Sequence, residues 1–242
     1  MFPFFLALLS IFYTLYFLIA QFSHSSFIKD KSKILIVTAH PDDECMFFAP
    51  TILNLLRHNC HVYLLCLSSG RFYNKSSVRK EELRQSCKTL GIPAGNLIIS
   101  EHGQLPDNPT IKWSRLKTSS IILKYIRHLS ATIVISFDET GISGHLNHIA
   151  VCESLQYLSI KGQLPEDCEV FLLKTVFLLQ KYLGFLLVPL LYVCTNFCFV
   201  STFHDVKTTW KSMKNHKSQF VWFRKLYIIF SQYVYINTFI KL

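Results

Sequence analysis

The residues best suited to chemistry lie in two short motifs. The first, His40-Pro41-Asp42-Asp43-Glu44, places a histidine and three carboxylates just after the apolar run Ile34–Val37. Such a run predicts a buried β-strand, so these side chains follow its carboxyl end, where open α/β sheets bind their ligands. A histidine beside carboxylates is able to bind a metal ion or to transfer protons.

The second motif, Gly144-His145-Leu146-Asn147-His148, follows a predicted strand that ends at Phe137. Its two histidines are three residues apart, so they share one face at the start of a predicted helix. A single histidine on a helix is more often an ordinary packed or surface residue than a ligand. Two such motifs at equivalent ends of parallel strands, however, favour a metal site.

Three nitrogen and oxygen ligands with one open position are typical of a catalytic zinc site. Zinc lowers the pKa of its bound water toward ~7 and polarises a substrate carbonyl, and a spare carboxylate beside it can act as a general base. The pair Cys194 and Cys198 lacks the second pair of ligands that a structural zinc site requires. We expect the eight cysteines to be reduced and mostly buried.

Strand-like and helix-like segments alternate through the middle of the chain. The predicted strands cover residues 34–38, 61–68, 96–100 and 131–137, and the predicted helices cover residues 44–58, 77–90, 113–129 and 145–158. This alternation predicts an α/β fold of the Rossmann-like type, in which a mostly parallel sheet carries helices on both faces. Residues 170–180 are a candidate for another strand.

The beginning of the chain predicts a membrane anchor over residues 1–23. Its apolar run, residues 2–22, has no charge and is long enough to cross a bilayer as a transmembrane helix. A signal peptide is the alternative, but the basic residues and the cleavage site of a signal peptide are missing. Lys29, Lys31 and Lys33 follow the run, so the positive-inside rule places the rest of the chain in the cytosol.

Behind this anchor we expect a linker over residues 24–33 and one domain over residues 34–242. The C-terminal part of that domain, about residues 182–242, is first apolar and then basic. Residues 182–203 are uncharged, but glycine, proline and asparagine interrupt them, so we favour a segment that packs on the domain or dips into one leaflet over a second span. From His204 onward, a basic aromatic stretch suits both a helix at a membrane interface and an ordinary surface helix.

The charge of the chain is strongly positive. Lysine and arginine number 25 against 15 aspartates and glutamates, a formal net charge of +10, with much of the excess near the C-terminus. This asymmetry suits an anionic membrane or nucleic acid equally. Because no nucleic-acid-binding motif is present, we expect a membrane partner and no nucleic acid.

The two motifs and the segments around them resemble the LmbE/PIG-L family of zinc-dependent N-deacetylases, and within it the eukaryotic members that act on a glycolipid. The resemblance covers residues 34–237 and is carried, in order, by HPDDECMFFAPTI, VYLLCLSSGRFYN, RKEELRQSCKTLGIP, SFDETGISGHLNHIA and WFRKLYIIFSQY. It implies an LmbE-like fold and hydrolysis of the acetamide of N-acetylglucosaminyl-phosphatidylinositol. That reaction gives glucosaminyl-phosphatidylinositol and acetate, the second step of GPI-anchor biosynthesis, at the endoplasmic reticulum membrane.

The resemblance also implies roles for individual residues. The expected zinc ligands, which would also suit another divalent metal, are His40, Asp43 and His148. Asp42 resembles the general base that activates the zinc-bound water, and His145 resembles the histidine that stabilises the oxyanion or protonates the leaving amine.

Arg79 resembles an arginine placed near the substrate phosphate or sugar. Bacterial relatives often have aspartate where this chain has Asn147. A carboxylate partner for His145 would therefore come from elsewhere, with Asp138 as the candidate, or be absent.

Two other functions are compatible with the sequence. One is deacetylation of a different N-acetylglucosamine conjugate, and the other is a membrane scaffold that keeps the fold without catalysis. The orientation in the membrane has its own marker, because Asn74-Lys75-Ser76 is a glycosylation sequon. Occupancy of that site would place the domain in the lumen.

Overall fold

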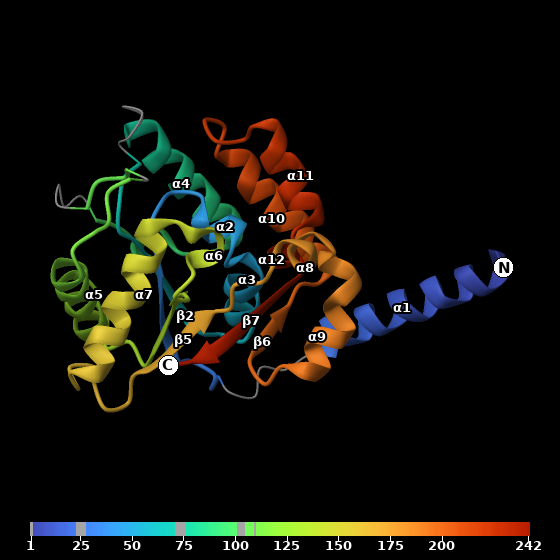
Figure 1. Ribbon diagram of the computed structural model, residues 1–242, viewed down its shortest axis with the longest axis horizontal. Coiled ribbons are helices and arrows are strands. Elements are labelled where there is room, and N and C mark those ends of the chain that lie inside the picture. Colours follow the sequence, from blue (N-terminus) through green and yellow to red (C-terminus); the bar gives the residue numbers. More distant parts are fainter. Residues whose placement is uncertain (1, 23–27, 71–75, 101–104, 109) are drawn as a thin grey trace.

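The computed structural model describes residues 2–22, 28–70, 76–100, 105–108 and 110–242, so Asn74 of the sequon lies outside the described residues. Within these ranges, seven strands form one sheet in the order β3-β2-β1-β4-β5-β7-β6 (Figure 1). The strands are β1 (Lys33–Thr38), β2 (His61–Cys66), β3 (Leu97–Ile99), β4 (Ile133–Phe137), β5 (Glu169–Leu173), β6 (Cys198–Val200) and β7 (Ile236–Lys241).

The sheet is mostly parallel, as predicted. β1 lies at its centre and pairs in parallel with β2 and with β4. β5 continues the parallel part, whereas β7 is antiparallel to both β5 and β6. Because β1 and β4 are adjacent and point the same way, the two chemical motifs that follow them meet at one edge of the sheet.

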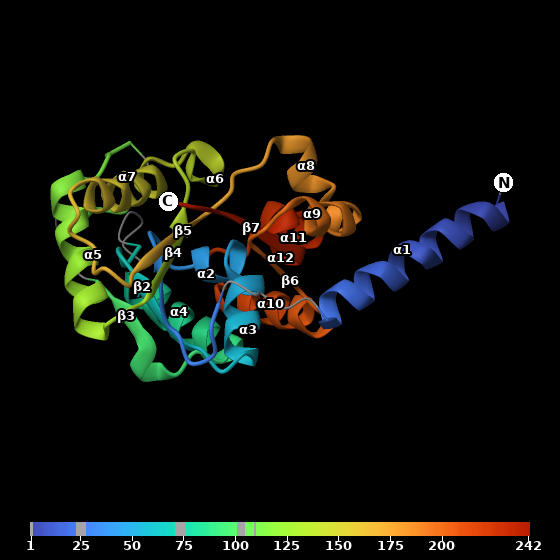
Figure 2. The ribbon, with the colours of Figure 1, turned by 90° about the horizontal axis from the view of Figure 1, so that it is seen from below.

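Helices cover both faces of the sheet (Figure 2). Their bounds are α2 (Asp43–Met46), α3 (Ala49–Arg57), α4 (Ser76–Leu90), α5 (Arg115–Leu129), α6 (Gly141–Gly144), α7 (Leu146–Ile160), α8 (Leu178–Tyr182), α9 (Val188–Cys194), α10 (Phe203–Asn215), α11 (Trp222–Phe230) and α12 (Gln232–Tyr235). Alternate residues of β1 point to opposite faces. Ile34 and Ile36 join the core under α3, α4 and α10, and Leu35 and Val37 join the core under α5 and α7.

The helix predicted over residues 44–58 is divided into α2 and α3. The second of these begins at Ala49, and Pro50 lies in its first turn. Proline is accommodated at the start of a helix but not in its interior, because it lacks an N–H group and its ring clashes with the preceding turn. The sequence pattern of apolar residues continues across this break and did not reveal it.

The predicted N-terminal helix forms as α1 (Phe2–Phe22) and projects from the body of the protein (Figure 1). Among the residues that the structure describes, however, no helix combines the length and apolar character needed to cross a membrane, so the predicted transmembrane span is not found. Part of α1 instead packs on protein. Tyr16 and Ala20 are both buried, and the Tyr16 hydroxyl donates a hydrogen bond to the Ser201 carbonyl (2.6 Å).

The C-terminal part is built from short elements. α9 is too short to span a bilayer and contacts α1, which agrees with the prediction of a segment packed on the domain. The basic stretch forms two helices: α10 packs against α4, and α11 exposes aromatic side chains. All eight cysteines are free thiols and five of them are buried, as predicted.

Candidate active site

All six predicted site residues line one cavity of about 280 Å³ at the carboxyl ends of β1 and β4. His40, Asp42 and Asp43 lie in the turn after β1, and His145 and His148 lie at the start of α7. The sixth, Arg79, comes from α4. The roles assigned to these residues stay predictions, but the structure brings together every residue to which one was assigned.

The turn after β1 is held by the side chain of Asp43. Its Oδ2 atom accepts hydrogen bonds from the backbone N–H groups of Ala39 (3.0 Å) and His40 (2.8 Å). Asp42 adopts a φ of 114°, a strained value for a residue other than glycine. As a result the two adjacent carboxylates diverge: Asp43 points into the turn and toward His148, and Asp42 points toward Arg224.

The donor atoms at this edge fit a divalent metal ion. Nitrogen atoms of His40, His145 and His148 all lie within 4.8 Å of one another. The Nδ1 atom of His148 lies 3.0 Å from the Gly141 carbonyl, which orients the ring so that Nε2 faces the Asp43 Oδ1 at 3.3 Å. That Nε2 is buried without a hydrogen-bond partner. A hydrogen bond from the other ring nitrogen to a backbone carbonyl, as His148 makes to Gly141, is typical of metal-binding histidines.

The electrostatics of His40 and Asp43 suit metal ligands, whereas His148 would have to lose a proton. Burial alone would lower the pKa of His148, but Asp43 outweighs it and the pKa is raised. Burial lowers the pKa of His40 to about 3, so its imidazole is neutral and keeps a lone pair. Burial alone would raise the pKa of Asp43, but the neighbouring His148 and His40 outweigh it and hold that pKa below its ordinary value. A neutral imidazole and an ionised carboxylate are the forms that bind a metal ion.

Asp42 is the carboxylate that the turn leaves free. It forms a close ion pair with Arg224, and Arg79 lies 3.8 Å away. Its side chain borders the cavity beside the histidine cluster. This position, next to the candidate metal ligands, is what a general base requires.

His145 is the N-cap of α7, and its Nδ1 atom accepts a hydrogen bond from the backbone N–H of Asn147 (3.3 Å). Burial lowers its pKa, and His148 lowers it further. Asp138, the candidate carboxylate partner, instead accepts hydrogen bonds from the backbone N–H groups of Gly141 (3.0 Å) and Thr175 (2.6 Å). Among the described residues, His145 therefore has no carboxylate partner, which is the other alternative left by the sequence.

The sequence assigned no role to the other residues that line the cavity, which include Asp107, Gln219 and Arg224. Asp107 forms an ion pair with Arg79 (2.8 Å), and its Oδ1 atom lies 3.2 Å from Nε2 of the neutral His40. It follows β3 in a loop, so its position after a strand was the one available signal. Arg224 lies in the basic stretch near the C-terminus, where no local pattern distinguishes it from the surrounding lysines.

Gly141 controls the position of His148. Its φ is +61°, and a Cβ atom added there would lie 2.8 Å from the His148 Cβ. We expect Gly141→Ala to displace His148, to weaken metal binding by about 10-fold or more, and to lower stability by about 1–3 kcal/mol. Gly144→Ala is the matched control, because Gly144 has a similar φ of +71° with nothing within 4 Å of the added atom. Equal metal affinity of the two variants, measured by titration with a zinc chelator, would contradict this role.

A buried ion pair between Glu44 and His216 holds the backbone of the first motif. The Glu44 Oε1 atom lies 2.7 Å from His216 Nε2 and also accepts a hydrogen bond from Ser86, and Glu44 Oε2 accepts the backbone N–H of Asp42 (3.0 Å). Glu44 and His216 are both fully buried. The pair therefore stabilises the strained backbone at Asp42.

We expect His216→Phe to cost about 3–5 kcal/mol, because it leaves the Glu44 charge buried without its cation. Burial would lower the pKa of His216, but Glu44 outweighs it and the pKa is raised. The stabilisation is then complete below about pH 6.5 and is lost as the pH rises through the higher pKa of the folded state. Urea unfolding at pH 6 and pH 9 should show a smaller difference between variant and wild type at pH 9, and the double variant Glu44→Gln/His216→Phe should recover part of the loss. An equal difference at both pH values would exclude a charged pair.

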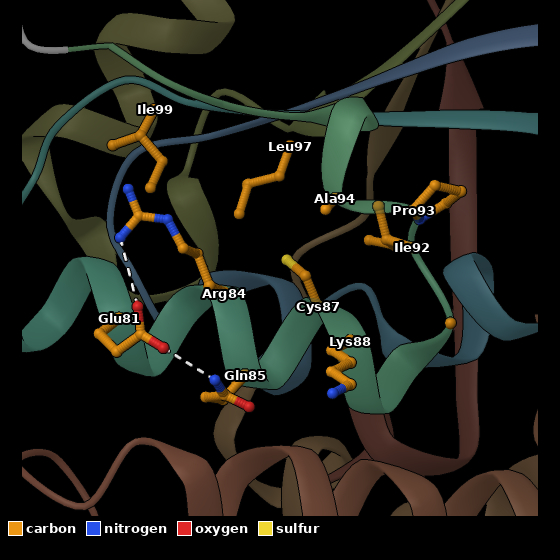
Figure 3. A pocket seen from close by; sticks show the side chains of 11 residues that line it. Glu81, Arg84, Gln85, Cys87, Lys88, Ile92, Pro93, Ala94, Leu97 and Ile99 are labelled. Atoms are coloured by element: carbon orange, nitrogen blue, oxygen red, sulfur yellow. Dashed lines mark hydrogen bonds and ion pairs between the residues drawn. The ribbon is translucent and has the colours of Figure 1, made fainter.

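A second cavity, of about 700 Å³, lies between α4 and the segment 91–99, which contains the 3₁₀ helix η2 (Ala94–Asn96) and β3 (Figure 3). Glu81 bonds to Arg84 and Gln85 at its border, and Cys87, Leu97 and other apolar side chains face it. None of the predicted site residues is among the described residues that line it. The predicted site residues therefore all belong to the smaller cavity.

The fold defines the structural class of the protein. N,N'-diacetylchitobiose deacetylase from Pyrococcus horikoshii has a solved structure that matches this one with a TM-score of 0.66 at 18% identity, covering 96% of this chain and 92% of that one. This similarity places the chain among proteins with the LmbE-like α/β fold.

The sequence then defines the family. The PIG-L family, described as GlcNAc-PI de-N-acetylase, matches residues 35–156. The N-acetylglucosaminyl-phosphatidylinositol de-N-acetylase of Bos taurus is 43% identical over 208 residues, covering 86% of this chain and 82% of the relative. A probable enzyme of the same name from Dictyostelium discoideum is 34% identical over 242 residues, covering 88% and 94%. The chain belongs to the PIG-L family of de-N-acetylases.

Proposed function

We propose that this protein removes the N-acetyl group from N-acetylglucosaminyl-phosphatidylinositol, giving glucosaminyl-phosphatidylinositol and acetate in an early step of GPI-anchor biosynthesis. The observation that carries the proposal is the cluster of His40, His145 and His148, whose nitrogen atoms lie within 4.8 Å of one another, in a chain of the PIG-L family. Asp43 lies 3.3 Å from His148 and 3.7 Å from His40, and Asp42 lines the same cavity. The names of the Bos taurus and Dictyostelium discoideum relatives supply the substrate.

We propose zinc as the metal, held by His40, Asp43 and His148. When bound, zinc supplies Lewis acidity, which polarises the acetamide carbonyl and makes a nearby water a better nucleophile. His145 lies close enough to the cluster for one of its nitrogens to be a further ligand. We assign it to catalysis instead, because His148 and Asp43 already form a buried pair and His145 is the more exposed histidine.

The protein side chains move the protons of the reaction. Asp42 accepts a proton from the attacking water as the oxygen–carbon bond forms. His145, whose side chain borders the cavity, stabilises the oxyanion and passes a proton to the amide nitrogen as the carbon–nitrogen bond breaks, and the proton that Asp42 took from the water replaces it. The products are acetate and a free amine, so no redox partner is needed.

The decisive experiment is a deacetylase assay of the purified protein on the glycolipid, with chelation and zinc add-back. We expect activity that chelation removes and zinc restores. Higher activity on a soluble N-acetylglucosamine conjugate than on the glycolipid would favour the alternative substrate. Bound zinc without activity on either substrate would favour the scaffold function.

We further propose that the protein works at the cytosolic face of the endoplasmic reticulum membrane. Large apolar side chains are exposed on α1, α8, α9 and α11, and these helices lie on one side of the body in both ribbon views (Figures 1 and 2). They include Ile11, Phe17, Leu178, Leu179, Leu190, Val193, Trp222 and Phe223. Exposed apolar surface of this kind suits insertion among lipid headgroups, where the glycolipid substrate lies.

Trp222 and Phe223 provide a test of this surface, because their side chains are exposed and the helix they begin also carries a residue of the cavity. We expect Trp222→Ser/Phe223→Ser to weaken binding to phosphatidylcholine vesicles by about 10-fold or more, from the loss of buried apolar area. Val78→Ser/Leu116→Ser removes two exposed apolar side chains from α4 and α5 and is the control. A vesicle-flotation assay that separates neither pair from wild type would exclude α11 from the membrane contact.

A further inference from the structure

Arg224 is placed in the cavity by the inner face of α11. Arg224, Tyr227 and Ile228 are spaced as one face of a helix, and Tyr227 and Ile228 are buried. The Tyr227 hydroxyl donates a hydrogen bond to the carbonyl of Met46 (3.1 Å), directly after the first motif. This contact fixes α11 against the catalytic turn, and the Arg224 side chain reaches Asp42 from there.

The two arginines of the cavity differ in what they can still bind. Arg79 donates to Asp107 (2.8 Å) and to the Pro41 carbonyl (2.9 Å), and its side chain is 6% exposed. Arg224 contacts Asp42 through Nη1, and its side chain is 20% exposed. A guanidinium has five N–H donors, so Arg224 retains donors for a ligand in the cavity, whereas Arg79 is largely committed to the protein.

We infer that Arg224 binds the phosphodiester of the substrate and makes the site selective for a phosphate-bearing glycoside. This inference rests on the proposed function. In the substrate, the phosphate lies between the sugar and the lipid. Arg224 lines the catalytic cavity, where the sugar must bind, and directly follows the exposed Trp222 and Phe223 at the start of the same helix. A planar guanidinium matches the oxygen atoms of a phosphodiester in a two-point contact.

The competing explanation is that Arg224 only positions the carboxylate of Asp42. The two roles differ in their dependence on substrate. A residue that acts only through Asp42 affects every acetamide substrate alike, whereas a phosphate-binding residue changes the preference between substrates with and without the phosphodiester. The informative quantity is therefore the ratio of the two kcat/KM values.

The test compares two soluble substrates in the same detergent: N-acetylglucosaminyl-inositol linked by its phosphodiester to a short-chain diacylglycerol, and N-acetylglucosaminyl-inositol without phosphate. Arg224→Gln should lower the kcat/KM ratio of the first to the second by at least about 10-fold. Arg224→Lys should lower this ratio less, since lysine keeps the positive charge but lacks the planar pair of donors that makes a two-point contact. Arg84→Gln, at an exposed arginine that also pairs with a carboxylate, should leave the ratio unchanged. An unchanged ratio in Arg224→Gln, with both rates reduced equally, would overturn the inference.

Direct binding separates this inference from the proposed function. Glycerophosphoinositol, which has the phosphodiester but no acetamide, should bind wild type at least about 10-fold more tightly than Arg224→Gln in a calorimetric titration. Equal binding by the two proteins would refute the role of Arg224 even if the glycolipid were deacetylated. Weaker binding by the variant would sustain that role even if wild type deacetylated neither substrate, a result that would refute the proposed function alone. The melting temperature and the zinc content of each variant verify that it is folded.

Discussion

Asp42→Asn is expected to lower kcat by about 10²–10⁴-fold, the usual contribution of a general base, while zinc binds at the wild-type stoichiometry. Asparagine has the shape of aspartate but cannot accept the proton of the attacking water. The Asp42 side chain makes none of the hydrogen bonds that hold the turn after β1, which come from Asp43 and Glu44. Its replacement should therefore leave the candidate metal ligands in place.

The measurements are single-turnover deacetylation and the zinc content of the purified variant. Asp42→Glu keeps the charge and is the companion variant, expected to retain more activity than Asp42→Asn. A rate for Asp42→Asn within about tenfold of wild type, with zinc bound, would falsify the assignment of the base, because general-base catalysis contributes more than that.

Asp43→Asn should have the opposite signature, with loss of the metal and, with it, the activity. The carboxylate Oδ2 holds the N–H groups of Ala39 and His40, and Oδ1 faces His148 at 3.3 Å. The amide oxygen of asparagine can keep the two backbone contacts, which then directs its NH₂ group toward the metal position. We expect zinc affinity to fall by more than roughly 10–100-fold, which is the cost of losing a residue that only orients a metal ligand.

Zinc content after gel filtration and affinity from chelator competition measure this loss. A near-normal circular dichroism spectrum would show that the variant is folded. The comparison with Asp42→Asn controls for charge, because both variants remove one negative charge from adjacent residues of the same cavity. If Asp43→Asn retained zinc and Asp42→Asn lost it, the two assigned roles would have to be exchanged.

The position of the two motifs could be predicted from sequence because it follows from short-range patterns. The apolar runs at Ile34–Val37 and 131–137 predict strands, and parallel strands deliver the residues after them to one edge of the sheet. His40 and His148 meet for this reason, with ring centroids 5.4 Å apart. No detail of packing was needed.

The remaining cavity residues depend on contacts between distant segments. Arg224 enters through the packing of α11 on the catalytic turn, which the local sequence does not specify. β7 was missed for a similar reason, because residues 236–241 become a strand by pairing with β5 and β6. The predicted transmembrane span rested on apolar composition alone, which does not distinguish lipid from the protein surface that covers Tyr16 and Ala20.

The position of β7 has a consequence for the order in which the protein assembles during synthesis. β7 comes after β6 in the sequence but lies between β5 and β6 in the sheet. While the ribosome is still making residues 201–235, β6 cannot pair with the sheet, because its partner β7 has not yet been made. The residues that carry His40 and His148 at the carboxyl ends of β1 and β4 have been made long before β7. We therefore expect nascent chains to form the half of the site with the candidate metal ligands before the α11 half, and the edge of β5 to stay unpaired and open to association with other chains until β7 has been made.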